Sequence, residues 1–97
     1  MKHNIPDRVM RDIVAAAKEY GVEKIILFGS RARGTHTKRS DMDIAVLGGD
    51  FDGFCLEIKE NAHTLLSFDI VELNNRVGEE LIEEIERDGI TIYEKDR

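Results

Sequence analysis

The spacing of apolar residues along the chain predicts three helices. Between Pro6 and Tyr20 the apolar residues recur every three or four positions, and a glycine follows, as it does after many helices. The same spacing recurs in residues 51–66, although a glycine near the start of that segment weakens the pattern there. Residues 78–88 repeat it, with glutamates at most of the positions outside the apolar stripe. Each helix should therefore present one apolar face to a core.

Four shorter segments between and after these helices have the pattern of strands. Residues 22–28 end in a continuous apolar run, which is typical of a strand covered on both faces. Residues 41–47 and 67–73 alternate in polarity, and residues 90–93 are short and rich in β-branched side chains. Because helices and strands alternate along the chain, we predict an α/β (α+β) fold with a small, largely parallel or mixed sheet of about four strands flanked by helices.

Composition limits what a chain of 97 residues can be. Hydrophobic residues make up 41% and charged residues 35%, which suits one core under a solvated surface, so we expect a single domain over residues 1–97. The formal net charge of -6 argues against broad electrostatic capture of nucleic acid or of an anionic membrane. The single Cys55 cannot form an internal disulfide, and neither a signal peptide nor a membrane-spanning apolar run is recognisable. We therefore expect a cytoplasmic protein.

The candidate chemistry lies where a Gly-Ser turn after a buried strand is followed, ten residues later, by two aspartates. Asp41 and Asp43 point to the same side of their strand, with Cα atoms roughly 6–7 Å apart. Two such carboxylates repel each other unless they share cations, and a cluster of hard oxygen ligands selects Mg²⁺ or Mn²⁺. A third carboxylate, Asp69, lies on another predicted strand, where burial is costly unless the group is paired or ligating. Three converging carboxylates suit two-metal catalysis of an in-line displacement.

The Gly-Ser turn and the loop after it are suited to phosphate. Gly29 lets the backbone approach a phosphate closely, and the Ser30 hydroxyl and amide can donate hydrogen bonds to phosphate oxygens. The loop is the most basic stretch of an acidic chain, and a triphosphate would be attracted to that charge. For each basic side chain a solvated surface position is an equally good interpretation, and Arg33 is the best single candidate for phosphate contact. The basic residues are Arg31, Arg33, Lys38 and Arg39.

These motifs together resemble a known family. The runs Gly-Ser-Arg-Ala-Arg-Gly at residues 29–34 and Ser-Asp-Met-Asp at residues 40–43 resemble the signature of the minimal nucleotidyltransferases, which are small members of the polymerase-beta-like nucleotidyltransferase superfamily. The resemblance covers nearly the whole chain, with the third aspartate of the family standing in Phe-Asp-Ile-Val at residues 68–71. It implies the polymerase-beta-like fold and a nucleotidyltransferase activity.

The resemblance also implies a role for each matching residue. Asp41 and Asp43 would ligate two Mg²⁺ ions, with Mn²⁺ as a possible substitute, and Asp69 would complete one site and help activate the acceptor hydroxyl. Gly29 and Ser30 would hold the phosphates of the nucleotide, most simply ATP. Because every signature position is present, the resemblance gives no reason to expect an inactive copy.

Many proteins of this kind resemble antitoxins encoded beside a helical HEPN ribonuclease toxin, and some transfer AMP from ATP to a tyrosine of the toxin. That resemblance implies a protein partner, and a net charge of -6 also favours a protein over nucleic acid. Two other functions stay open. The chain could be an antitoxin that neutralises its partner by binding and occlusion alone, or a transferase that acts on a small molecule or an RNA end.

Two further features have ordinary structural interpretations. Glu72 resembles a fourth catalytic carboxylate, but it points to the opposite side of its strand from Asp69. The glutamates of residues 79–86 are typical of a solvated helix face, with partner docking as the minority interpretation.

Overall fold

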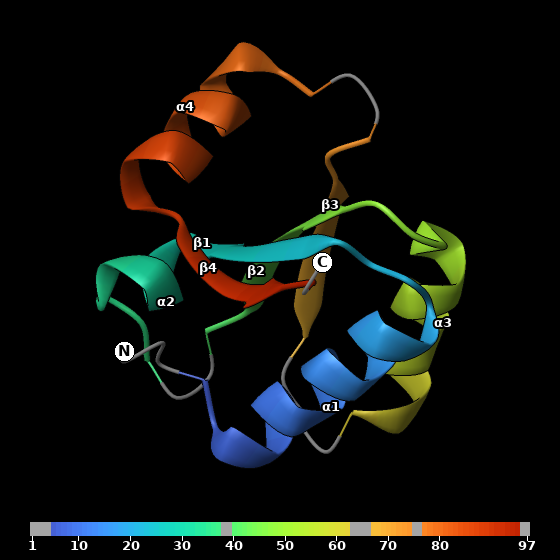
Figure 1. Ribbon diagram of the computed structural model, residues 1–97. Coiled ribbons are helices and arrows are strands. Elements are labelled where there is room, and N and C mark those ends of the chain that lie inside the picture. The colour runs from blue at the N-terminus through green and yellow to red at the C-terminus, as the bar shows by residue number, and fades with distance from the viewer. Residues whose placement is uncertain (1–4, 38–39, 63–66, 75–76, 96–97) are drawn as a thin grey trace.

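The computed structural model describes residues 5–37, 40–62, 67–74 and 77–95. Helices and strands alternate along the chain almost as the sequence predicts (Figure 1). In chain order the elements are α1 (Asp7–Glu19), β1 (Lys24–Phe28), α2 (Ser30–Arg33), β2 (Met42–Leu47), α3 (Phe51–Asn61), β3 (Phe68–Glu72), α4 (Glu79–Asp88) and β4 (Ile90–Glu94).

The four strands form one mixed sheet in the order β3-β2-β1-β4. Strand β1 is antiparallel to both β2 and β4, and only β2 and β3 run parallel. The prediction of a mixed sheet is confirmed, whereas the largely parallel alternative is wrong. The reason is that a parallel pair needs a long crossover, and α3 supplies one between β2 and β3, while the short α2 and its loop return the chain antiparallel to β1.

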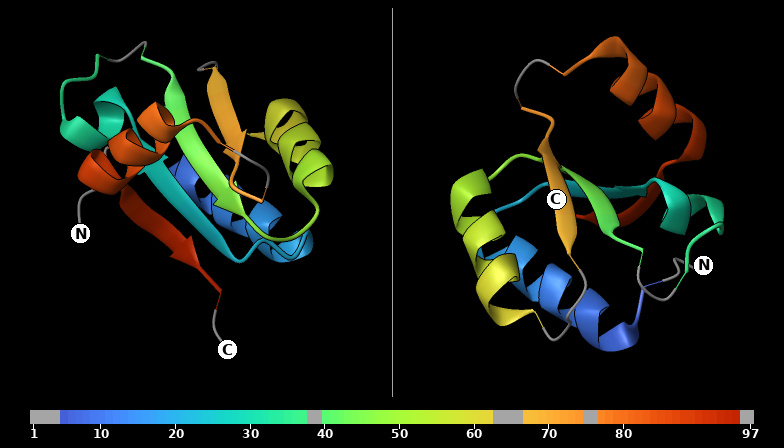
Figure 2. Two further views of the ribbon diagram at one scale, coloured as in Figure 1. Left: turned by 90° about the horizontal axis from the view of Figure 1, so that it is seen from above. Right: turned by 180° about the vertical axis from the view of Figure 1, so that it is seen from behind.

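The helices cover both faces of the sheet (Figures 1 and 2). Helices α1 and α3 lie on one face and α4 lies on the other. The larger core lies on the α1 and α3 side, and a smaller cluster joins Ile85 of α4 to Phe28 and Ala45. Strand β1 is therefore covered on both faces, as its continuous apolar run predicts. The fully or nearly fully buried residues of the larger core are Ile5, Val9, Ile13, Ala16, Ala17, Val22, Ile25, Leu27, Met42, Ile44, Val46, Phe54 and Ile58.

Some element boundaries differ from the prediction. Helix α3 ends at Asn61 because Ala62 adopts an extended conformation, so the helix predicted to reach residue 66 is too long; residues 63–66 lie outside the described residues. The helix nevertheless begins at Phe51, with Gly53 in its first turn. The amide of Gly53 donates the capping hydrogen bond to Asp50 (3.1 Å), and a Cβ there would collide with the ring of Tyr20.

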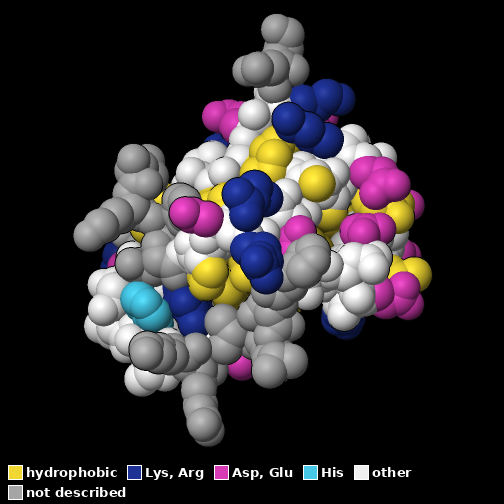
Figure 3. Space-filling view, turned by 90° about the horizontal axis from the view of Figure 1, so that it is seen from below, with side chains coloured by type: hydrophobic (Ala, Val, Ile, Leu, Met, Phe, Trp, Pro, Cys, Tyr) yellow, Lys and Arg dark blue, Asp and Glu magenta, His cyan; other side chains and the backbone are white. Residues whose placement is uncertain are grey.

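The charges are distributed unevenly over the surface. In the view from the α1 side, Lys and Arg side chains lie across the middle of the face and Asp and Glu side chains gather towards one edge (Figure 3). The exposed residues of α1 include Arg8, Arg11 and Lys18. No described helix is long and apolar enough to cross a membrane.

Candidate active site

The parallel pair of strands places two of the three predicted aspartates side by side. Asp43 of β2 and Asp69 of β3 are partners in the strand register, and adjacent strands lie about 4.8 Å apart. Both aspartates point to the α4 side of the sheet, because Ala45 and Val71, two residues further along each strand, pack in the α4 cluster. Asp43 is half-buried and Asp69 is exposed. The sheet therefore presents two neighbouring carboxylates on its α4 side.

Asp41 lies one residue before β2 and is exposed, so it is at the end of the strand rather than within it. Burial is the largest influence on Asp43 and raises the pKa of its carboxyl, and the carboxylates of Asp69 and Asp41 raise that pKa further. Glu84 of α4 adds to the same effect, whereas the guanidinium of Arg33 lowers the pKa of Asp43. Four carboxylates from three separate segments thus create one region of negative potential around Asp43.

Gly29 packs against the side chain of Asp43. Its φ of 74° and ψ of -157° lie in a region that is essentially restricted to glycine. A Cβ at this position would collide with the carboxylate of Asp43, with the Asp43 Cγ at 3.0 Å and Cβ at 3.2 Å. The Gly29 carbonyl accepts hydrogen bonds from the amides of Ala32 and Arg33, each 3.1 Å long, and these begin α2. The turn formed by Gly29 and Ser30, which we call the phosphate turn, therefore packs directly against Asp43, a predicted metal ligand.

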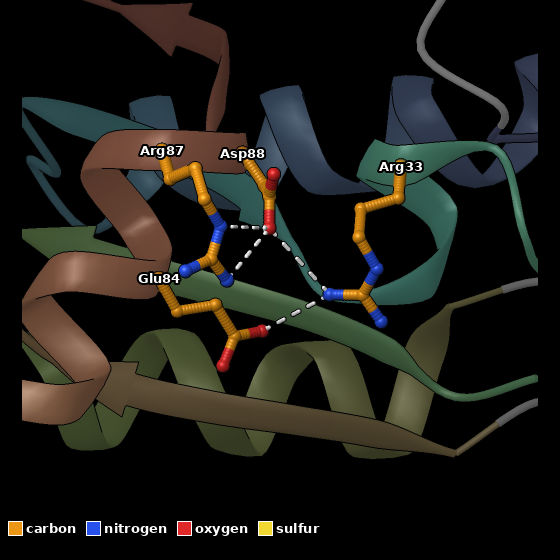
Figure 4. Close-up of polar contacts among 4 residues, drawn as sticks. All are labelled: Arg33, Glu84, Arg87 and Asp88. Atoms are coloured by element: carbon orange, nitrogen blue, oxygen red, sulfur yellow. Dashed lines mark hydrogen bonds and ion pairs between the residues drawn. The ribbon is translucent and has the colours of Figure 1, made fainter.

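Arg33 occupies the space between α2 and α4 (Figure 4). Its Nη1 lies 3.5 Å from Glu84 Oε2 and 3.7 Å from Asp88 Oδ2, while Asp88 also pairs with Arg87 at 3.1 Å. These groups are partly exposed, so the pairs add little stability. The predicted phosphate-binding cation is thus held by two carboxylates of α4 close to Asp43.

Glu84 and Asp88 were missed by the interpretation of the glutamate-rich helix as a solvated face. Both lie next to the site because they flank the buried Ile85 at positions i-1 and i+3, which turn towards the sheet. Their four-residue spacing around one apolar residue was the available signal.

The position of Arg31 differs from both expectations for the basic loop, which were a solvated side chain or direct contact with phosphate. Arg31 is only 4% exposed, and its Nε donates to the carbonyl oxygen of Ser40 at 3.1 Å. A second guanidinium nitrogen, Nη2, donates to the carbonyl oxygen of Thr37 at 3.4 Å. Lys38 and Arg39 lie outside the described residues. Arg31 therefore belongs to the framework of the loop.

Glu72 has the structural surroundings expected of it. Its carboxylate accepts a hydrogen bond from Asn74 Nδ2 at 3.2 Å, and Asn74 Oδ1 accepts one from the amide of Gly48 at 2.8 Å. These bonds connect the ends of β3 and β2, away from Asp69.

The donor chemistry fits a hard divalent cation. The three predicted ligands are carboxylates, which Mg²⁺ and Mn²⁺ prefer, and the strand register supplies the proximity of Asp43 and Asp69. Within the described ranges, no three His, Cys, Asp or Glu side chains already converge into a metal cage. A cation bound between these carboxylates would offset their mutual repulsion.

Comparison with known proteins agrees with this geometry. The family model described as "Polymerase beta, Nucleotidyltransferase" matches residues 11–97. A Methanocaldococcus jannaschii protein named "Putative protein adenylyltransferase MJ0604" is 44% identical over 50 residues, which cover 47% of this chain and 50% of that protein. The match thus spans about half the length of that relative.

Two solved structures have the same fold. A chain from the crystal structure of a toxin-antitoxin with AMP-PNP aligns with a TM-score of 0.70 and 25% identity, over 89% of this chain and 73% of the other. A chain of the toxin-antitoxin MntA-HpeT aligns with a TM-score of 0.69 and 23% identity, over the same shares of the two chains. Because the family model covers most of the chain, this protein belongs to the polymerase beta nucleotidyltransferase family.

Proposed function

We propose that this member of the polymerase beta nucleotidyltransferase family is a Mg²⁺-dependent enzyme that transfers AMP from ATP to a hydroxyl of a partner protein. The observation that carries the proposal is the placement of Asp43 beside Asp69 in the strand register, with Gly29 packed beneath Asp43. One small region thus holds the predicted metal ligands and the predicted phosphate turn. This combination suits phosphoryl chemistry better than it suits a binding surface.

The reaction is a single in-line displacement at the α-phosphorus of ATP. The oxygen of the acceptor hydroxyl forms a bond to that phosphorus, the bond to the oxygen bridging the α- and β-phosphorus atoms breaks, and pyrophosphate leaves. The acceptor proton passes to the carboxylate of Asp69, which is exposed and therefore accessible to an incoming side chain. Bound Mg²⁺ would stabilise the charge on the attacking and leaving oxygens.

Each remaining residue has a binding or orienting role. Asp41 and Asp43 would hold the cations, with Asp69 completing one of the two sites. Gly29 and Ser30 bind phosphate oxygens through backbone and hydroxyl donors. Arg33 provides a positive charge for the triphosphate. Its guanidinium must leave Glu84 and Asp88 to pair with the phosphates when the nucleotide binds.

The proposed acceptor is a protein because two kinds of similarity point that way. One similar protein is named as a protein adenylyltransferase, and one similar fold comes from a toxin-antitoxin crystallised with AMP-PNP. A net charge of -6 favours a basic protein partner. We therefore propose that the chain is an antitoxin whose acceptor is a tyrosine of a HEPN ribonuclease toxin.

The proposal is tested by label transfer. The purified chain is incubated with Mg²⁺, ATP labelled on the α-phosphate and the protein encoded beside it, and the Asp41→Asn variant is run in parallel. Asp52→Asn is the matched control, because Asp52 is an exposed aspartate of α3 outside the site. We expect label on the neighbouring protein with the wild type and the control but not with Asp41→Asn. Transfer that persists in Asp41→Asn would contradict the mechanism.

The second candidate function is neutralisation by binding alone. It is favoured by the similarity in fold to a chain of a toxin-antitoxin structure, because association with a toxin does not by itself require catalysis. It predicts that a double Asp41→Ala, Asp43→Ala variant neutralises its partner as well as the wild type does. A growth assay with the co-expressed partner distinguishes the two, since loss of neutralisation by the double variant supports catalysis.

A further inference from the structure

The loop between the phosphate turn and the aspartates is organised by one buried cation. Arg31 is only 4% exposed, although it lies in the most basic stretch of the chain and was expected at the surface or against phosphate. A buried guanidinium is costly unless its donors are used. Its Nε and Nη2 meet that requirement by donating hydrogen bonds to the carbonyl oxygens of Ser40 and Thr37, respectively.

These bonds join the two halves of the proposed site. Arg31 directly follows Ser30 of the phosphate turn, and its partner Ser40 directly precedes Asp41. The side chain therefore connects Arg31, next to the phosphate turn, with Ser40, next to Asp41. A change in this link would move Asp41 relative to the phosphate turn without touching either group directly.

Asp41 is also held from its other side. The amide of Met42 donates to the carbonyl oxygen of Ser67 at 3.0 Å, and Ser67 immediately precedes β3, which carries Asp69. Asp41 thus lies between two fixed backbone groups, the Ser40 carbonyl and the Met42 amide. Local bonds reinforce the first of these, because the Thr37 amide donates to Ser40 Oγ at 2.8 Å.

We infer that Arg31 is a positioning residue that fixes Asp41 at its working distance from the Gly29-Ser30 turn. The planar fork of a guanidinium can serve two carbonyl oxygens of different residues at once, whereas the single ammonium of lysine is poorly matched to both. The inference rests on the proposed function only in assigning Asp41 to metal binding. The restraint of the loop itself follows from the hydrogen bonds.

The experiment measures Mn²⁺ binding in the presence of α,β-methylene-ATP, whose altered linkage blocks cleavage between the α- and β-phosphorus atoms. Binding is followed by isothermal titration for the wild type, Arg31→Lys and Arg31→Gln. Each of these variants is also made in the Asp41→Asn background. Arg11→Gln is the control for loss of one arginine, because Arg11 is exposed on α1. Circular dichroism establishes that each variant is folded.

We expect Arg31→Gln to weaken Mn²⁺ binding by about tenfold or more, as loss of charge-assisted hydrogen bonds does, and Arg31→Lys to weaken it less. In the Asp41→Asn background the Arg31 changes should have almost no further effect, because Arg31 acts through Asp41. A general loss of stability would instead weaken binding equally in both backgrounds. Equal effects, or a folded Arg31→Lys that binds Mn²⁺ like the wild type, would overturn the inference.

A second readout does not depend on the proposed function. In the protein without metal or nucleotide, Arg31→Lys should accelerate hydrogen exchange at the amides of Thr37 and Ser40, while the β2 amides exchange as in the wild type. Unchanged exchange at Thr37 and Ser40 would overturn the inference. If the wild type bound no Mn²⁺ with the nucleotide, the proposed function would fail while this exchange result would still decide the role of Arg31.

Discussion

Replacement of Gly29 by alanine tests the contact between the phosphate turn and Asp43. The backbone at Gly29 lies in a region where another residue costs about 1–3 kcal/mol. The added Cβ would also collide with the Asp43 carboxylate, and overpacking of this kind costs about 1–3 kcal/mol. The sum, roughly 2–6 kcal/mol, is a large part of the roughly 5–15 kcal/mol that stabilises an ordinary domain.

Gly34→Ala is the matched control. Gly34 also has a positive φ, 81°, but an added Cβ there would meet no described atom within 4 Å. Its cost should be that of left-handed backbone alone, about 1–2 kcal/mol. Urea unfolding followed by far-UV circular dichroism gives both free energies, provided that the denaturant slopes agree.

A double-mutant cycle separates the collision from the backbone strain at Gly29. In an Asp43→Ala background most of the collision disappears, so Gly29→Ala should cost roughly 1–3 kcal/mol less than in the wild type. An equal cost in the two backgrounds would refute the claim that the turn packs against Asp43. If Mn²⁺ binds as proposed and stabilises the wild type, Gly29→Ala should abolish that increase in stability, because the added Cβ displaces the proposed metal ligand Asp43.

Three further predictions concern Asp43, Arg33 and the packing of α4. Burial and neighbouring carboxylates raise the pKa of Asp43, which means that its charged form is disfavoured, so Asp43→Asn should raise the melting temperature in EDTA. Because the group is partly solvated, the gain in stability should be at most about 1 kcal/mol, and a lower melting temperature would contradict this explanation. Arg33→Gln should change the free energy of unfolding by less than about 1 kcal/mol, because the ion pairs of Arg33 are partly exposed. It should weaken ATP binding measurably in calorimetry, and unchanged binding would exclude Arg33 from the proposed phosphate site. Ile85→Ala should lower the free energy of unfolding in urea by about 2–4 kcal/mol, because it removes the buried contact of α4 with the sheet. Ile82→Ala, at a position 39% exposed, should cost much less, and similar losses would contradict the packing of α4.

The sequence predicted most of the fold because its apolar periodicities are strong. Alternation along residues 41–47 correctly assigned Asp43 to the face opposite Ile44, and the continuous apolar run of β1 correctly predicted cover on both sides. Strand direction was harder, because periodicity is the same in parallel and antiparallel strands. The pairing of Asp43 with Asp69 also depends on register, which no local pattern specifies.

The roles of the basic residues were less predictable. Arg31 and Arg33 are two residues apart in the same motif, yet one is buried against backbone carbonyls and the other pairs with α4. Their directions are set by the path of the loop and by the position of α4, both of which are tertiary features. Charge alone could therefore identify the basic stretch but could not show that Arg31 supports the loop while Arg33 pairs with α4.

A crystal structure with Mn²⁺ and α,β-methylene-ATP would show whether the three aspartates bind metal beside the phosphate turn, since the anomalous scattering of manganese locates the ions. We predict manganese bound by Asp41, Asp43 and Asp69, with the nucleotide phosphates on Gly29 and Ser30. Manganese away from these aspartates, or phosphates bound elsewhere on the chain, would contradict this prediction.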